Sequence, residues 1–367
     1  MRDHPLHDRE TAMDRVQGAD RLTTLSKVLD PKALAQHLCL FSLPPWNWGA
    51  IEEVQVRVLR PKLERCTLEI RLRSENGWHS LIGKVYGSDR ADVFQAMERI
   101  GQAGFGPQEE FSIPQPLVYL SSLRLLVQEK VEGPRAKEIF ATSDERGCAA
   151  AAERCARWLA RFHAIAPKAG PVSDPDEFFN SESMSEAMQQ CLRELAGAGS
   201  RIAEKSARLL EGLKDAAGAL SPVEMHAGHG SYSPSHVIPA SGRTVVFDWD
   251  GYDVADPARD LGRFLASLRR LALVKLGSIR ALDAMAEIFL STYLDAGQPE
   301  ALRNLRFYEA AACLKLAKHS FFHTRIERME ATLDEALCIL EQEPAVGSTA
   351  RVASGCSTAI DLPKWSG

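Results

Sequence analysis

Residues 226–264 read HAGHGSYSPSHVIPASGRTVVFDWDGYDVADPARDLGRF, and this stretch decides the fold. A polar loop opens with His-Gly-Ser at 229–231, and an apolar run at 244–247 predicts a short buried strand. Asp248 and Asp250 follow directly at the end of that run. Carboxylates at the end of a buried strand need a counter-charge, so this position is a candidate for cation binding.

The spacing of Asp248 and Asp250 restricts how the pair can be used. Both can face one ion only if the strand has already ended, which Gly251 permits. Mg²⁺ bound to a triphosphate is a cation that would suit such a pair. The alternative is a turn in which one Asp accepts backbone hydrogen bonds and the other is solvated. The pair alone does not decide between them.

A helix is predicted to begin directly after these carboxylates. Asp256 and Pro257 form a typical helix start, with Asp as the N-cap and Pro in the first turn. An ordinary capped helix is sufficient to explain Asp256. Asp260 lies on the same face as Phe264 and is therefore expected to point inward, where it needs hydrogen-bond donors. Backbone N–H groups of the 229–231 loop are the expected donors.

The composition is that of an ordinary globular protein: 367 residues, 45% hydrophobic and 25% charged. This length suggests two or three domains, or one large two-lobed unit. A formal net charge of -5 argues against a broad nucleic-acid surface. The N-terminus is too polar for a secretory signal, and no apolar run reaches the length of a membrane span. Eight cysteines without a Cys-x-x-Cys pair suggest free thiols and a cytoplasmic location.

The first third of the chain predicts a small antiparallel sheet. Residues 1–20 are polar and expected to be frayed, and helical spacing of apolar residues follows over 22–40. Alternating apolar residues predict strands at 54–58 and 68–72, and apolar segments predict further strands at 80–86, 117–120 and 123–127. The first two strands are joined by a basic turn at 60–65, and the third carries Lys84. A helix at 91–103 contains Glu98.

The rest of the chain is mainly helical after a hinge at 131–134. Helical periodicity covers 149–164, 182–220, 261–276, 279–294 and 302–342, and the Ser-, Gly- and Ala-rich residues 344–367 are expected to be a disordered tail. The expected fold is therefore α+β and two-lobed, with a small sheet lobe at 21–130 and a larger helical lobe at 131–343. The 244–247 strand is expected beneath the cleft between them, where small molecules commonly bind.

Lys84 is predicted to be buried, because its strand neighbours are apolar. A buried ammonium is costly unless it is paired, and Glu98 on the following helix is the natural partner. A Lys–Glu pair that holds nucleotide phosphates recurs in kinase-type sites. The alternative is an exposed edge-strand Lys and an unrelated Glu on a helix surface.

Three histidines leave a metal-hydrolase alternative open. His226, His229 and His236 could bind zinc together with Asp248, although their spacing matches no short zinc motif. A serine hydrolase using Ser231 is less well supported, because the Gly-x-Ser-x-Gly elbow is absent.

The sequence resembles the aminoglycoside phosphotransferase and choline kinase-like superfamily, which is related to the protein kinases. The likeness spans about residues 50 to 340 and is most specific in His229-Gly230, Asp248, Asp250 and the segment 256–261, Asp-Pro-Ala-Arg-Asp-Leu. It implies a kinase-like fold, ATP and Mg²⁺ as cofactors, and transfer of the γ-phosphate to a hydroxyl of a small molecule. No nucleic acid or membrane partner is implied.

The resemblance also implies a role for individual residues. Lys84 would hold phosphates, Glu98 would orient Lys84, and Gln128 with Glu129 would lie in the linker that hydrogen-bonds adenine. The implied metal ligands are Asp248, Asp250 and His236. His229 and Asp260 would brace the catalytic loop, and residues 158–163 look like the family's Leu-His helix end.

The chain departs from the family pattern at three places. Ser231 stands where the family has its catalytic Asp, and His236 where it has a metal-binding Asn. A hydroxyl is not a competent general base near neutral pH, and loss of the base typically costs about 10²- to 10⁴-fold in rate. The basic turn at 60–65 replaces a glycine-rich loop and either grips phosphate or is simply solvated. The leading hypothesis is thus a cytoplasmic ATP-dependent phosphotransferase; the alternative is a pseudokinase that binds nucleotide or a partner without catalysis.

Overall fold

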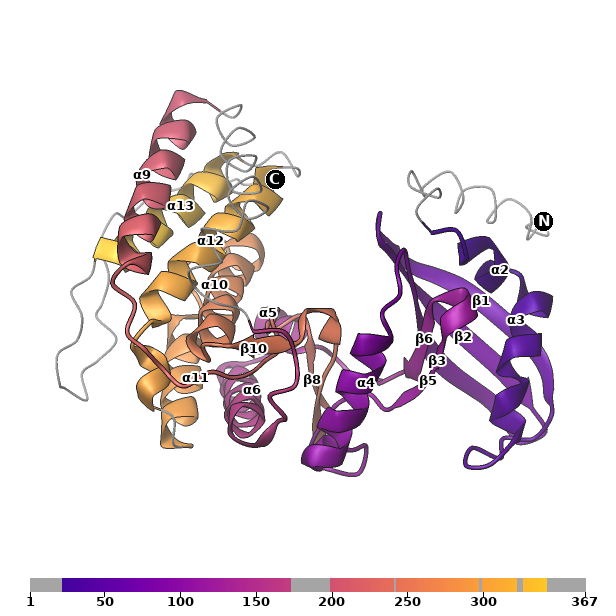
Figure 1. The fold of residues 1–367 in the computed structure, drawn as a ribbon. Helices are drawn as coiled ribbons and strands as arrows, with labels where there is room; N and C mark the ends of the chain where they lie inside the picture. Colours follow the sequence, from indigo (N-terminus) through magenta and orange to yellow (C-terminus); the bar gives the residue numbers. More distant parts are fainter. Residues whose placement is uncertain (1–21, 173–198, 241, 297–298, 322–325, 342–367) are drawn as a thin grey trace. The chain divides into compact units, whose positions relative to one another are not determined.

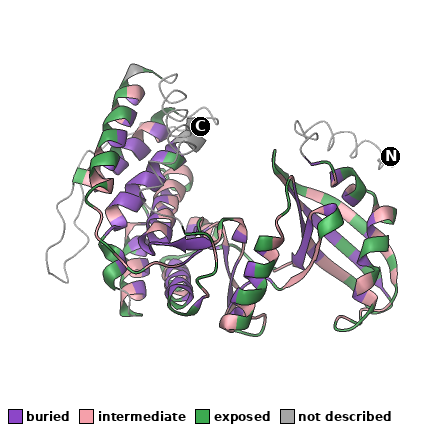
Figure 2. Ribbon diagram, viewed as in Figure 1, coloured by how far each residue is buried: buried purple, intermediate pink, exposed green. Residues whose placement is uncertain are grey.

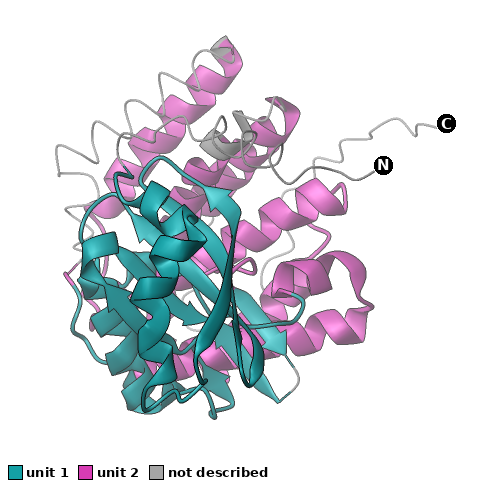
Figure 3. Cartoon of the chain, turned by 90° about the vertical axis from the view of Figure 1, so that its right-hand side faces the viewer, with its two compact units in different colours: residues 1–134, 165–170, 237–252 teal, residues 135–164, 171–236, 253–367 magenta. Residues whose placement is uncertain are grey.

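The computed structural model describes residues 22–172, 199–240, 242–296, 299–321 and 326–341 (Figure 1). The chain divides into two compact units, shown in different colours in Figure 3. Unit 1 comprises residues 1–134, 165–170 and 237–252, and unit 2 comprises 135–164, 171–236 and 253–367. The expected two-lobed α+β class is confirmed. The predictions for residues 1–20, 182–198 and 344–367 lie outside the described residues.

Unit 1 is built on a five-stranded antiparallel sheet with the order β1-β2-β3-β6-β5. The strands are β1 (Ile51–Pro61), β2 (Arg65–Ser74), β3 (Gly77–Tyr86), β5 (Pro116–Leu120) and β6 (Leu125–Glu129). All five were predicted, the first two from alternation of apolar residues and the other three from apolar segments. The first three are longer than predicted, because their polar ends continue the backbone pairing after the apolar pattern has stopped.

One face of this sheet is covered by α2 (Leu25–Leu29) and α3 (Pro31–Leu38), followed by the 3₁₀ turn η1 (Cys39–Ser42) (Figure 1). The helical spacing predicted over 22–40 is confirmed, and it is divided between two helices. Asp30 accepts a hydrogen bond from the backbone N–H of Lys32, which caps a new helix, and Pro31 occupies its first position. Proline cannot donate to the preceding turn, so the chain starts a second helix there.

The helix α4 (Ala91–Ile100) continues into the π-type turn η2 (Gly101–Phe105), so the predicted helix 91–103 is confirmed in outline. A second, three-stranded sheet of unit 1 has the order β4-β9-β8. Its strands are β4 (Phe111–Ser112), β8 (Val237–Ala240) and β9 (Arg243–Val246). The strand predicted at 244–247 is β9, and it pairs in parallel with β4 and antiparallel with β8.

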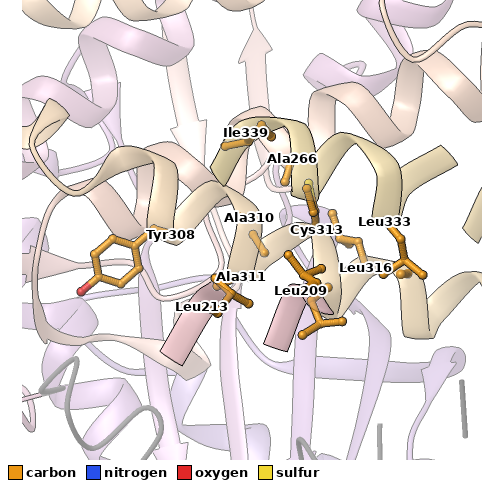
Figure 4. Packing of buried hydrophobic residues seen from close by; sticks show 14 of the residues in the cluster. Leu209, Leu213, Ala266, Tyr308, Ala310, Ala311, Cys313, Leu316, Leu333 and Ile339 are labelled. Carbon is orange, nitrogen blue, oxygen red and sulfur yellow. The ribbon is translucent and has the colours of Figure 1, made fainter. Parts of the chain in front are cut away.

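Unit 2 is mainly helical. Its helices are α5 (Ala136–Thr142), α6 (Glu145–Ile165), α9 (Ser200–Ala217), α10 (Ala258–Lys275), α11 (Asp283–Asp295), η5 (Pro299–Leu302), α12 (Leu305–Phe321) and α13 (Ile326–Glu341). Leucine, alanine and aromatic side chains of α9, α10, α12 and α13 form a hydrophobic core cluster (Figure 4). Figure 2 colours the buried residues of these helices purple. A two-stranded ladder pairs β7 (His226–Gly228) with β10 (Asp253–Ala255). No helix in the described part of the chain is both long and apolar enough to cross a bilayer.

Helices α10 and α12 approach each other very closely at Gly262. A Cβ atom at this position would lie 2.5 Å from the backbone nitrogen of Glu309 and 2.7 Å from the carbonyl carbon of Tyr308. Any larger side chain would therefore force the two backbones apart. Since Asp260 lies two residues earlier on α10, this contact helps to hold the first turn of that helix in place.

Candidate functional site

The backbone turns sharply where β9 ends, and this turn presents the two predicted carboxylates. Asp248 adopts a left-handed conformation with φ of 77°, which short polar side chains tolerate better than most. The 3₁₀ turn η4 (Trp249–Gly251) follows, and the buried Trp249 donates its indole N–H to the carbonyl of Val246 at 3.0 Å. Strand β9 has thus ended before Asp248 and Asp250, which is the condition for both carboxylates to face one ion.

Lys84 connects these two carboxylates. Its Nζ lies 2.9 Å from Oδ1 of Asp248 and 3.0 Å from Oδ1 of Asp250, and its side chain is only 6% exposed. The hydroxyl of Tyr86 donates to Oδ1 of Asp250 at 2.8 Å. Burial lowers the pKa of Lys84, and the charge of Asp248 acts against that shift. The ammonium predicted to need a partner therefore has two, as a buried charge requires.

Arg65 is a second cation on the same carboxylates. Its Nη1 donates to Oδ1 of Asp248 at 2.9 Å and forms an ion pair with Asp250. In the antiparallel register of β2 and β3, Arg65 is opposite Tyr86 and Thr67 is opposite Lys84. Since alternate residues of a strand share a face, Arg65 lies on the same face as Lys84 and Tyr86. The sequence had placed Arg65 in a basic turn that either grips phosphate or is solvated, and its contact with Asp248 and Asp250 was not predicted.

A pocket of about 350 Å³ adjoins these groups in unit 1. It is lined by Lys62, Glu64, Arg65, Tyr86, Ser88, Arg90 and Asp250. Arg90 donates from Nη2 to the backbone carbonyl of Asp250 at 2.9 Å and from Nε to the Asp92 carboxylate at 3.0 Å. This arginine therefore fixes the turn after β9 from the loop before α4.

Glu98 does not have the position expected of it. The apolar face of α4 carries the buried residues Val93, Ala96, Met97 and Ile100. Glu98 follows Met97 by one residue, about 100° around the helix, and is exposed. Among the described residues no ion pair joins Glu98 to Lys84, because Asp248 and Asp250 occupy the ammonium instead. Its role toward a nucleotide stays a prediction.

The two linker residues differ in their surroundings. Gln128 is buried on β6, opposite Ile82 of β3. The Glu129 carboxylate forms an ion pair with Arg243 and accepts a hydrogen bond from the backbone N–H of Gln115 at 3.1 Å. Glu129 thus ties β6 to the β8–β9 hairpin, while contact of either residue with adenine stays a prediction.

In unit 2, Asp260 accepts hydrogen bonds from the loop that begins at His229. The backbone N–H groups of His229 and Gly230 donate to Oδ2 and Oδ1 at 2.6 and 3.0 Å. Gly230 has φ of 76°, which a glycine adopts without strain. Burial alone would raise the pKa of Asp260, but its interactions with His163 and Arg259 hold that pKa well below its usual range. Asp260 therefore stays ionised and braces the loop.

A buried histidine stands behind Asp260. His163 Nε2 lies 3.6 Å from Oδ2 of Asp260, and its Nδ1 lies 2.7 Å from the hydroxyl of Tyr293. Burial lowers the pKa of His163 and raises that of Tyr293. The phenol is therefore the donor to Nδ1, while Nε2 lies near the Asp260 carboxylate but beyond hydrogen-bond distance. Tyr293 was missed from the sequence, because nothing near it in the chain points to Asp260.

Residues 84–334, more than half of the chain, match the profile of the phosphotransferase enzyme family. The chain belongs to this family. No curated protein sequence matches it.

Solved structures similar to this family member show the same fold at low identity. Aminoglycoside phosphotransferase APH(4)-Ia has a TM-score of 0.55 and 14% identity, over 84% of this chain and 98% of its own. A choline/ethanolamine kinase family protein from Mesorhizobium loti has a TM-score of 0.53 and 13% identity, over 84% and 94%. Choline kinase from Cryptosporidium parvum Iowa II has a TM-score of 0.54 and 10% identity, over 84% and 95%.

The phosphotransferase-family loop carries a hydroxyl and two imidazoles where its catalytic groups are expected. Ser231 Oγ lies 3.3 Å from Nδ1 of His229, and the rings of His229 and His236 stack with their centroids 5.9 Å apart. Nδ1 of His236 lies 2.9 Å from the carbonyl oxygen of Ser231. These contacts hold the loop closed on itself. His236 as a metal ligand stays a prediction.

The zinc alternative finds no support. Within the described ranges, no group of three or more His, Cys, Asp or Glu side chains is placed to hold a metal ion. His226 instead lies with Nδ1 2.7 Å from the carbonyl oxygen of His163. A zinc site needs several converging nitrogen, sulfur or oxygen ligands. These histidines instead contact Ser231 and the backbone carbonyl of His163.

Proposed function

We propose that the protein is an ATP- and Mg²⁺-dependent phosphotransferase that transfers the γ-phosphate to a hydroxyl group of a small molecule in the cytoplasm. The observation that carries this proposal is the contact of one buried ammonium, Lys84, with two carboxylates, Asp248 and Asp250. A lysine beside paired acids is the recurring phosphate and metal arrangement of kinase-type sites. Membership of the phosphotransferase enzyme family supports the same reaction class.

The donor set of Asp248 and Asp250 suits Mg²⁺, which prefers carboxylate oxygens and completes its shell with phosphate and water. When bound, the ion neutralises charge on the phosphates. We assign nucleotide binding to residues 21–130 with the turn after β9, and acceptor binding to the helical residues 131–343. Lys84 would bind phosphate oxygens, and Gln128 and Glu129 would face the base.

The braced loop is assigned to positioning. The Asp260 carboxylate holds the backbone of His229 and Gly230, so the loop is already ordered when an acceptor arrives. Such pre-organisation matters in phosphoryl transfer, where catalysis depends mainly on positioning and on stabilisation of charge. Activity without an acid at Ser231 is compatible with this view, at a reduced rate.

The test is binding of ATP with Mg²⁺ by isothermal titration calorimetry, followed by a phosphate-release screen over sugars, aminoglycosides, amino alcohols and nucleosides. The expected result is saturable ATP binding that Asp248→Ala removes, and turnover with at least one acceptor class. Absence of ATP binding with Mg²⁺ in the wild-type protein would overturn the proposal.

A second candidate is a pseudokinase, and the hydroxyl of Ser231 at the base position favours it. This candidate predicts ATP binding without turnover in the wild type, and ATP turnover in Ser231→Asp. Turnover in the wild type that Asp248→Ala abolishes would instead decide for the enzyme.

A further inference from the structure

Arg65 competes with any cation for the pair of carboxylates after β9. It contacts both Asp248 and Asp250, as Lys84 does. Two unit positive charges thus face two unit negative charges, so the cluster is already neutral. A divalent ion that binds these oxygens competes with Arg65 and Lys84, whose summed charge of +2 equals that of the ion.

The backbone on which Arg65 stands is held independently of its side chain. The N–H of Lys62 donates to the carbonyl of Arg65 at 2.9 Å, and the N–H of Gly87 donates to the carbonyl of Glu64 at 2.9 Å. The end of the β1–β2 hairpin is therefore tied to the loop after β3. The Arg65 side chain, by contrast, makes its polar contacts with Asp248 and Asp250, and Arg65 lines the 350 Å³ pocket. A long side chain on a fixed backbone can change its partner without a change in the hairpin.

The hairpin end also concentrates positive charge. Lys62 lines the same pocket, and burial together with the charges of Arg65 and Arg60 lowers its pKa. Cations that crowd one another in this way are stabilised by an added anion. Phosphate oxygens are good partners for a guanidinium, because its fork of N–H groups can bind two of them at once.

We propose that Arg65 is a phosphate-binding residue that exchanges the Asp248 and Asp250 carboxylates for the phosphate oxygens of the nucleotide when Mg²⁺ takes the carboxylates. This inference rests on the proposed function. Arg65 then has opposite effects on the two ligands. It opposes binding of the divalent ion alone, because it must be displaced, and it favours the nucleotide, because it supplies a charged donor. The exchange couples the two binding events.

The test compares wild type, Arg65→Gln and Arg65→Lys with the matched control Arg60→Gln, which removes a charge from the same hairpin. Mn²⁺ alone is the first probe, with the free ion followed by electron paramagnetic resonance. ATP with excess Mg²⁺ is the second, followed by calorimetry. Arg65→Gln is expected to bind Mn²⁺ alone about tenfold more tightly and ATP–Mg²⁺ about tenfold more weakly. Arg60→Gln should change both by less than about threefold.

Opposite shifts in Arg65→Gln support the proposal, and shifts of the same sign or none overturn it. If Arg65→Gln does not fold, as judged by circular dichroism, Arg65→Lys decides. It keeps the charge but not the fork, so it should show shifts of the same signs and smaller size, and wild-type values would overturn the exchange. Failure of the wild type to bind ATP–Mg²⁺ marks failure of the proposed function. Normal wild-type binding without opposite shifts marks failure of this inference alone.

Discussion

Two acidic clusters of this protein are built on different principles. Asp248 and Asp250 in unit 1 are bound by long cationic side chains, and their own side chains are 19% and 17% exposed. Asp260 in unit 2 is 2% exposed and accepts hydrogen bonds from backbone N–H groups. Side-chain partners can be exchanged for a ligand, whereas backbone partners cannot leave. The first cluster is suited to binding and the second to holding a loop in place.

This difference predicts how variants divide between ligand binding and stability. Changes in the unit 1 cluster should alter affinity more than folding, because each carboxylate has both Lys84 and Arg65 as partners and keeps one when the other is lost. Changes around Asp260 should alter folding first, because removal of a buried partner leaves unsatisfied polar groups.

The largest expected effect is that of Lys84→Ala on ATP–Mg²⁺ binding. Loss of a buried ammonium that would contact both phosphate and carboxylates should weaken the affinity by about 100-fold. Calorimetric titration measures this, with the exposed Lys32→Ala in the same unit as the control. Unchanged affinity in Lys84→Ala would show that this cluster is structural, like that of Asp260.

Asp260→Asn should reduce the free energy of unfolding by about 3 kcal/mol near neutral pH. The folded state lowers the pKa of Asp260, while an unfolded Asp titrates near about 3.9, so its stabilisation is fully present above about pH 5 and is lost as the pH falls toward the folded value. Urea unfolding at several pH values should therefore show a difference that shrinks below about pH 4. The exposed Asp295→Asn serves as the control, and a difference independent of pH would contradict ionisation of Asp260.

Gly262→Ala tests whether the position of Asp260 depends on the close crossing of α10 and α12. The added methyl group would meet backbone atoms of Glu309 and Tyr308, so we expect a loss of about 2 kcal/mol in unfolding free energy. Thermal unfolding measures this loss. Gly277→Ala is the comparison that separates crowding from backbone strain. A Cβ atom at Gly277 would meet nothing within 4 Å, so only the positive φ of 80° would make this substitution unfavourable. An equal loss in both variants would contradict crowding as the cause.

The smallest effect is expected for Tyr293→Phe. It removes the hydroxyl that lies 2.7 Å from Nδ1 of His163 and should cost about 1 kcal/mol of stability, measured by urea unfolding. ATP–Mg²⁺ affinity should stay unchanged in this variant. Weakened affinity without loss of stability would mean that the two clusters are not separate in function.

Much of the site could be predicted from local pattern. Alternating residues and apolar segments identified the strands of the five-stranded sheet, and the end of an apolar run identified Asp248 and Asp250. Its shared helix face with Phe264 placed Asp260 inward, and the loop N–H groups were correctly expected as its donors. These features depend on the strand and helix periods and on the rule that buried charges need partners. Both can be recognised from residues that are close together in the sequence.

The choice among partners was decided only by the tertiary structure. From the sequence, Lys84 had a plausible partner in Glu98, but Glu98 lies off the buried face of α4 and is exposed. The turn after β9 supplies two carboxylates to Lys84 instead. The role of Arg65 follows from the β2–β3 register, and that of Tyr293 from a contact 130 residues away in the chain. Opposite charges are abundant in any sequence. Which of them meet depends on distances that only the packed chain sets, because electrostatic and hydrogen-bond energies fall steeply with separation.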